Sequence, residues 1–214
     1  MKRYGPFLIA ALAGLICLGG CESAPQPPSA GTTALTSDPR SRELYLTLIA
    51  EMNNDGEYYA AIAHIDEFER LYGKAARAEM LRGDALIGLG DLAKAEAAYD
   101  SIPDDSLPGD KQYGLGRVAA ARSDWKKAAA YLKDAAAAQP TNVRFLDDLG
   151  CALFRLGETD DALFALHKAH ELAPADAEVS RNLSIALAGK SGGAPATKPE
   201  AIATAADPSG AQPP

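Results

Sequence analysis

The spacing of His167 and His170 comes nearest to a pattern that could do chemistry. The two histidines are three residues apart in a helical pattern, and Glu171 follows the second. Residues three apart share one face of a helix, so both imidazoles could reach a surface metal ion. No third ligand from another segment is evident, and a stable metal site needs one. We therefore interpret the pair as solvated side chains and expect no metal site.

Other segments that could support catalysis lack the residues that catalysis needs. Asp104, Asp105 and Asp110 crowd one loop, but they lack the alternating ligands and the terminal glutamate of an EF-hand. The sequence has no glycine-rich phosphate loop, no nucleophile elbow and no paired cysteine–histidine arrangement. We therefore predict that the protein is not an enzyme and has no catalytic residue, no cofactor-binding residue and no small-molecule substrate.

The N-terminal segment has the composition of a secretory signal. Lys2 and Arg3 are followed by an uncharged run over residues 7–20. A basic start followed by a short apolar run is typical of a cleaved signal peptide, and the run is shorter than the roughly 20 residues that a transmembrane helix needs. We expect residues 1–20 to be a signal peptide.

The end of that run, Leu18-Gly19-Gly20-Cys21, resembles a bacterial lipobox. The resemblance implies that Cys21 becomes the mature N-terminus, with diacylglycerol on its sulfur and usually a third acyl chain on its amine. Two or more chains are enough for stable membrane anchoring. The alternative is an ordinary signal peptide that contains a cysteine. We expect lipidation of Cys21 and no other bound group, and we expect Cys151 to be a partly buried structural cysteine without a disulfide partner.

Charge and composition limit the partners and the domain plan. Loss of residues 1–20 would remove Lys2 and Arg3, which leaves 19 basic and 29 acidic side chains and a net charge of −10. Phosphate backbones repel such a surface, so we expect no nucleic acid partner and membrane attachment through acyl chains alone. Residues 21–37 and 189–214 are rich in small residues and proline, which predicts a flexible tether and a disordered tail on either side of a domain at 38–188.

That domain contains an internal repeat. Gly83, Gly116 and Gly150 are separated by 33 and 34 residues. Ala95, Ala128 and Ala162 have the same separations, and Pro140 and Pro174 are 34 apart. A period of 34 with small residues in phase is the pattern of a helix–turn–helix solenoid.

The unit from Val143 to Pro174 resembles the tetratricopeptide repeat (TPR). Gly150 and Ala162 would let its two helices approach closely, Gly157 would end the first helix, and Pro174 would stop the second. The preceding unit has Ser123 where that glycine is expected, and Pro103 should shorten the second helix of the unit before it. We predict an all-α TPR solenoid of about four helix–turn–helix repeats, with residues 177–189 as a C-terminal capping helix.

The TPR resemblance also implies a partner-binding groove. In TPR arrays the first helix of each repeat lines the concave face, and certain positions of that helix point into it. Mapped onto this chain, these positions predict an apolar stripe flanked by arginines, suited to an amphipathic helix or an extended peptide with some acidic character. The alternative is that several of these side chains pack between repeats. The predicted groove residues are Leu46, Met80, Asp84, Ile87, Tyr113, Arg117, Arg144, Phe154 and Arg155.

The last helix narrows the resemblance further. Its sequence SRNLSIALAG, with Arg181, Asn182 and Leu183, is similar to the end of the repeats in the TadD family of tight-adherence (Flp) pilus assembly proteins. The resemblance implies an outer-membrane lipoprotein facing the periplasm, a pilotin that binds the pilus secretin and helps it to assemble or reach the outer membrane. Three alternatives remain: a type IV pilus pilotin of the PilF/PilW kind, a general envelope scaffold for peptidoglycan hydrolases or outer-membrane barrel assembly, and, last, an enzyme of unknown type with metal at His167 and His170.

Overall fold

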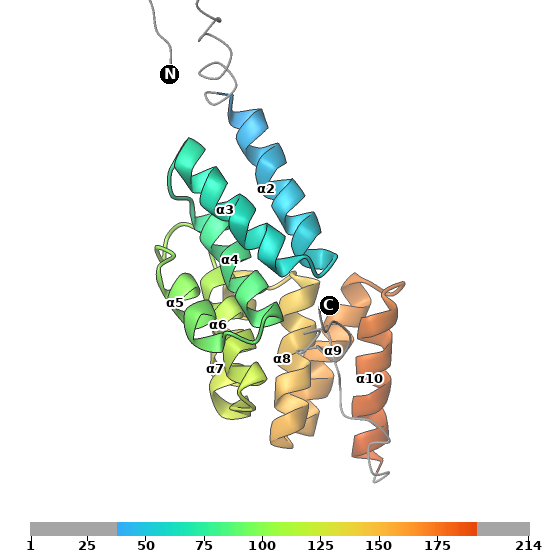
Figure 1. Cartoon of the computed structure of the whole chain (residues 1–214). Coiled ribbons are helices and arrows are strands. Elements are labelled where there is room, and N and C mark those ends of the chain that lie inside the picture. Colours follow the sequence, from blue (N-terminus) through green and yellow to red (C-terminus); the bar gives the residue numbers. More distant parts are fainter. Residues whose placement is uncertain (1–37, 192–214) are drawn as a thin grey trace, which may run out of the picture.

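The computed structural model describes residues 38–191, and within this range all regular structure is α-helical. Figure 1 shows successive helices that run in opposite directions and stack in chain order. The helices are α2 (Pro39–Asn54), α3 (Tyr58–Tyr72), α4 (Ala76–Gly88), α5 (Leu92–Asp100), α6 (Asp110–Ala121), α7 (Trp125–Ala138), α8 (Val143–Leu156), α9 (Thr159–Leu172) and α10 (Ala177–Lys190).

The helices within residues 38–191 form four pairs and a final single helix. The pairs are α2–α3, α4–α5, α6–α7 and α8–α9, and α10 packs against α9 and α8. The first helices of the early pairs also contact one another, α2 with α4 and α4 with α6. This arrangement confirms the predicted TPR solenoid of four repeats with a capping helix.

Polar side chains define where several helices begin. The side chains of Asp91, Asp124 and Asn142 each accept a hydrogen bond from the backbone N–H three residues later. Asp176 accepts from the N–H groups of Glu178 and Val179 at the start of α10. These bonds satisfy donors that have no partner inside a helix, and each such cap contributes about 1 kcal/mol to stability.

Small residues lie where paired helices cross. A Cβ added at Gly150 would lie 2.5 Å from Leu166 Cγ and 3.1 Å from the carbonyl oxygen of Ala162. Leu153 and Leu166, which flank this crossing, are buried. The predicted role of Gly150 as a point of close helix approach is confirmed, because no larger side chain fits without moving α9.

The turns follow the predicted chemistry as well. Gly157 ends α8 in the left-handed conformation, with φ of 84°. Ser123 takes the equivalent place after α6 with φ of 61°, and it is the one non-glycine residue with positive φ among residues 38–191. Helix α5 ends at Asp100, three residues before Pro103, as expected.

Several predicted features lie outside the described residues. They are the signal peptide at 1–20, the lipidation site Cys21 with the tether at 21–37, and residues 192–214 of the tail. Within the described part of the chain, no helix combines the length and apolarity needed to cross a bilayer.

Candidate functional site

A recess of about 60 Å³ opens between α4, α6 and α8, the first helices of the last three repeats. Tyr99 reaches it from α5. Its lining joins apolar, aromatic and charged side chains, and it includes four of the residues that the sequence places in a groove. The lining residues are Met80, Asp84, Tyr99, Asp110, Tyr113, Gly114, Asn142, Arg144 and Phe145.

Asp84 holds one wall of the recess together. Its carboxylate accepts a 2.7 Å hydrogen bond from the Tyr99 hydroxyl and pairs with the guanidinium of Arg117. The Tyr99 side chain is fully buried, and burial together with the Asp84 charge raises the pKa of Tyr99 well above its usual value. Since α4, α5 and α6 each supply one member, this wall is a rigid part of the solenoid.

Tyr113 forms the aromatic floor. Its ring stacks on Phe145 with centroids 4.5 Å apart, and the guanidinium groups of Arg117 and Arg144 lie 5.7 Å and 5.3 Å from its centroid. Burial raises the pKa of Tyr113, so its hydroxyl stays neutral near pH 7. Two guanidinium groups over one ring add positive charge to this aromatic floor.

Two further carboxyl groups belong to this region: Asp110 lines the recess, and Asp148 lies close to Tyr113. Asp148 is buried, and burial raises its pKa to about 6 although the charge of Arg117 acts in the opposite direction. Asp110 accepts a 3.0 Å hydrogen bond from the Gln139 amide, and burial raises its pKa as well. Both groups are therefore easier to protonate than an exposed aspartate, which reduces the negative charge in and beside the recess.

Arg144 differs from the other charged residues of the recess. It is exposed, it contacts the Tyr113 hydroxyl at 3.5 Å, and across residues 38–191 it forms no salt bridge. An exposed guanidinium held over an aromatic ring can pair with the carboxylate of a binding partner. The recess therefore has the chemistry of a recognition site, with no nucleophile beside a base among its lining residues.

The structure brings together five of the nine predicted groove residues. Met80, Asp84, Tyr113 and Arg144 line the recess, and Arg117 joins them through its ion pair with Asp84. Tyr113, however, is only 8% exposed, so its ring acts as the floor instead of projecting toward a partner.

The other four residues do not form an apolar stripe with these, and that part of the expectation is corrected. Leu46 and Ile87 are buried in the packing of α2–α4 and of α4–α6, because neighbouring first helices contact each other there. Phe154 packs against Gly189 of α10, and the guanidinium of Arg155 lies over the ring of Trp125. The alternative that several of these side chains pack between repeats holds for these positions.

Residues that sequence reasoning missed complete the recess. Tyr99, Phe145 and Asp148 were not predicted, because Tyr99 belongs to the second helix of its pair and the other two lie beside the assigned positions. One sequence feature could have indicated Tyr99: it is a large aromatic residue on the helix that faces Gly83. The ring of Tyr99 fills the space that a Cβ at Gly83 or Gly114 would occupy.

Other predicted chemistry is also located. Cys151 is buried in α8, and burial raises its pKa well above the usual value. His170 Nδ1 lies 3.3 Å from the hydroxyl oxygen of Ser180 on α10, and His167 is exposed. In the described range no three metal-ligating side chains converge.

Comparison with known proteins gives a consistent family. Two tetratricopeptide-repeat models match residues 54–111 and 143–176. A TPR repeat-containing protein of Pseudomonas aeruginosa, PA4299, is 30% identical over 159 residues, which cover 72% of this chain. This chain spans 61% of the length of that relative.

Solved structures share the fold. TTC0263 of Thermus thermophilus, a TPR protein, superposes with a TM-score of 0.60 at 22% identity, over 72% of this chain and 86% of that one. MamA of Desulfovibrio magneticus RS-1 superposes with a TM-score of 0.54 at 23% identity, over 70% of this chain and 85% of that one. YrrB is described as a TPR protein with an unusual peptide-binding site. It superposes with a TM-score of 0.52 at 23% identity, over 76% of this chain and 84% of that one.

The helix pairs, the repeat spacing and these matches define a TPR solenoid, a fold that typically serves as a scaffold for protein–protein interaction. This chain thus has the TPR fold and carries tetratricopeptide repeats at residues 54–111 and 143–176.

Proposed function

We propose that this protein is a lipid-anchored TPR adaptor of the bacterial cell envelope that binds a protein client at the recess and assists a Tad/Flp pilus secretin to assemble in, or reach, the outer membrane. The lipid is carried on Cys21 and the helical domain faces the periplasm. The resemblance of Leu18-Gly19-Gly20-Cys21 to a lipobox supports the anchor, and the likeness of the α10 sequence to the TadD family supports the pilus role.

The observation that carries the client site is the position of Arg144. It is an exposed cation above a buried aromatic pair, on the first helix of a repeat, with no carboxylate partner among the described residues. A client segment that presents a carboxylate to Arg144 and an apolar side chain to Met80 and the Tyr113 edge would satisfy both parts of the recess. The client site is therefore smaller and more polar than the apolar stripe expected from the sequence.

Crosslinking in intact envelopes followed by affinity recovery tests this proposal. Wild-type protein is compared with Arg144→Glu, which reverses the free charge, and with Arg181→Glu, which makes the same change on the exposed side of α10. We expect a secretin to be recovered with wild type and with Arg181→Glu, and several-fold less with Arg144→Glu. Equal recovery with all three would remove the recess from the proposal. Cell-wall hydrolases or barrel-assembly proteins in place of a secretin would remove the pilus role.

The anchor has its own test. Metabolic labelling with a palmitate analogue should mark the wild-type protein and fail to mark Cys21→Ser, which should then leave the membrane fraction. Labelling that persists in the serine variant would contradict lipidation at this position.

A further inference from the structure

A second and much larger hollow lies away from the recess. Helices α3, α4 and α5 enclose an open cleft of about 810 Å³, and none of its lining residues lines the recess. This volume lies within the roughly 300–1,000 Å³ typical of ligand sites. Nothing in the proposed client site uses this cleft.

One part of the cleft is apolar. Leu86 of α4 and Leu89 at the C-terminal end of that helix lie between Ile62 of α3 and Ala97 and Ala98 of α5. Leu86 is largely buried and Leu89 is half-buried, so the two leucines give the cleft a narrow apolar wall. Such a surface suits aliphatic carbon chains.

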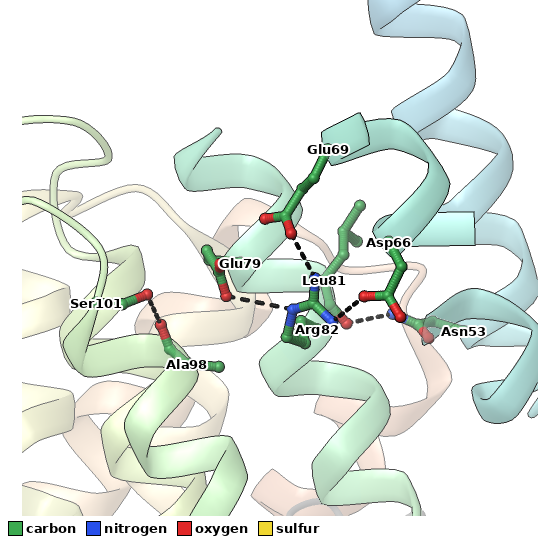
Figure 2. Close-up of polar contacts among 8 residues, drawn as sticks. All are labelled: Asn53, Asp66, Glu69, Glu79, Leu81, Arg82, Ala98 and Ser101. Atoms are coloured by element: carbon green, nitrogen blue, oxygen red, sulfur yellow. Dashed lines mark hydrogen bonds and ion pairs between the residues drawn. The ribbon is translucent and has the colours of Figure 1, made fainter. Parts of the chain in front are cut away.

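The other part is acidic and centred on Arg82, which is shown in Figure 2. The Arg82 guanidinium lies 2.7 Å from Asp66, 2.9 Å from Glu69 and 3.4 Å from Glu79. Three carboxylates thus surround one cation. Asp66 lies outside the cleft lining, Lys94 pairs with Asp91 at 2.6 Å, and Lys74 at the exposed rim offsets part of the negative charge.

Two observations show that this acidic group is incompletely satisfied. Glu69 Oε1 is buried, and the described residues supply no hydrogen-bond donor to it. Burial raises the pKa of Glu79, and the neighbouring Glu69 acts in the same direction while Arg82 and Lys74 oppose it. A buried carboxylate oxygen without a donor costs free energy that an added donor would recover.

We propose that this cleft binds a peptide segment of a second protein partner through a lysine or arginine that pairs with Glu69 and Glu79. The aliphatic stem of that residue and an adjacent apolar side chain lie on Leu86 and Leu89, because long basic side chains bury their methylenes while the charged head remains paired. Tyr59, 79% exposed, is an aromatic side chain at the rim of the same cleft. The net charge of −8 favours approach of a basic segment.

The test uses two fluorescein-labelled, C-terminally amidated peptides and the full-length protein in detergent. One peptide is Ala-Leu-Ala-Lys-Ala-Leu-Ala, and the other has glutamate in place of lysine. We expect saturable binding of the lysine peptide by fluorescence anisotropy and no binding of the glutamate peptide at the same concentrations. Equal binding of both peptides, or no binding of the lysine peptide, would overturn the proposal.

Two variants of the cleft separate a specific site from general attraction. Glu69→Gln with Glu79→Gln keeps the side-chain shapes and should weaken binding of the lysine peptide about ten-fold. Ala97→Trp fills the cleft from an exposed helix position and keeps every charge, so it should weaken binding to a similar extent. Unchanged binding to Ala97→Trp would mean attraction to the acidic surface alone. Arg144→Glu should leave peptide binding unchanged, so failure of the client-site proposal and failure of this one are distinguishable.

Discussion

The side-chain amide of Asn182, on the capping helix α10, donates a 2.8 Å hydrogen bond to the carboxylate of Asp147 on α8, and both side chains are almost fully buried. The other carboxylate oxygen, Asp147 Oδ1, and the amide oxygen of Asn182 are both buried with no donor among residues 38–191. Burial raises the pKa of Asp147 to about 7, and the charges of Asp148 and Glu178 add to this effect. The cap is therefore attached through a carboxyl group whose burial favours the protonated form, although the hydrogen bond from Asn182 acts in the opposite direction.

This pair predicts a pH dependence that Asp147→Asn should remove. The folded protein keeps the proton on Asp147 up to a pH of about 7, whereas the unfolded chain releases it near pH 4. Folding thus takes up a proton in this window, and the contribution of Asp147 to stability falls as pH rises through it. An asparagine can instead form two hydrogen bonds with Asn182 at any pH.

Urea unfolding of wild type and Asp147→Asn between pH 4 and pH 8 checks this prediction. The two proteins should have similar stability near pH 4, and the variant should become the more stable one toward pH 8. A stability difference that does not change with pH would refute the linkage, and a variant less stable at pH 8 would refute the pairing.

The close approach at Gly150 predicts a cost for the smallest possible side chain. Gly150→Ala would place a methyl group 2.5 Å from Leu166 Cγ, so α8 and α9 must move apart. We expect a loss of about 1–3 kcal/mol in the free energy of unfolding. Ser184→Ala, at an exposed position of α10, should change it by less than about 0.5 kcal/mol. A Gly150→Ala variant as stable as wild type would mean that the crossing is looser than described.

The turn after α6 offers a stabilising change. Ser123 has φ of 61°, a conformation that costs a residue with a side chain about 1–2 kcal/mol. Ser123→Gly should therefore stabilise the protein by roughly 0.5–1 kcal/mol after the larger entropy of unfolded glycine is included. Thermal unfolding measures the change. Gly157→Ala at the matching turn should have the opposite sign, and the idea fails if both variants shift the midpoint in the same direction.

The two sides of the recess should respond differently to substitution. Tyr99→Phe removes the 2.7 Å hydrogen bond to Asp84 inside the solenoid and should cost about 1–2 kcal/mol. Arg144→Glu changes an exposed residue and should alter stability by less than about 0.5 kcal/mol. Denaturant unfolding of both variants tests this. A strongly destabilised Arg144→Glu would show that Arg144 supports the fold instead of remaining free for a partner.

The repeat pattern was sufficient to predict the helices and their pairing. The 34-residue separations of Gly116 from Gly150 and of Ala128 from Ala162 mark the close contact between the two helices of each repeat. Because these two helices are neighbours in the chain, their contact can be predicted from a short stretch of sequence. Gly157 and Ser123 occupy equivalent positions of that pattern, and both have a positive φ. The geometry that depends on one repeat was therefore predictable.

Features that depend on how successive repeats stack were not predictable from the sequence. Leu46 and Ile87 are buried because successive first helices contact each other, and the repeat pattern does not specify that contact. The same limit applies to the cleft around Arg82, whose walls come from two repeats. The sequence feature that came closest to predicting this cleft is Pro103, which predicted that helix α5 is short. The five recess residues were found because they belong to first helices of consecutive repeats.

The central proposal is that a lipid-anchored adaptor binds a secretin at the recess and helps it to reach the outer membrane. The position of the secretin in the cell tests this proposal most directly. Membranes separated by density would be probed for secretin multimers in cells that produce wild type, Cys21→Ser, Arg144→Glu or Arg181→Glu. We predict multimers in the outer-membrane fraction with wild type and Arg181→Glu, and a marked loss from it with Cys21→Ser and Arg144→Glu. Secretin multimers that reach the outer membrane equally in all four strains would contradict the claim.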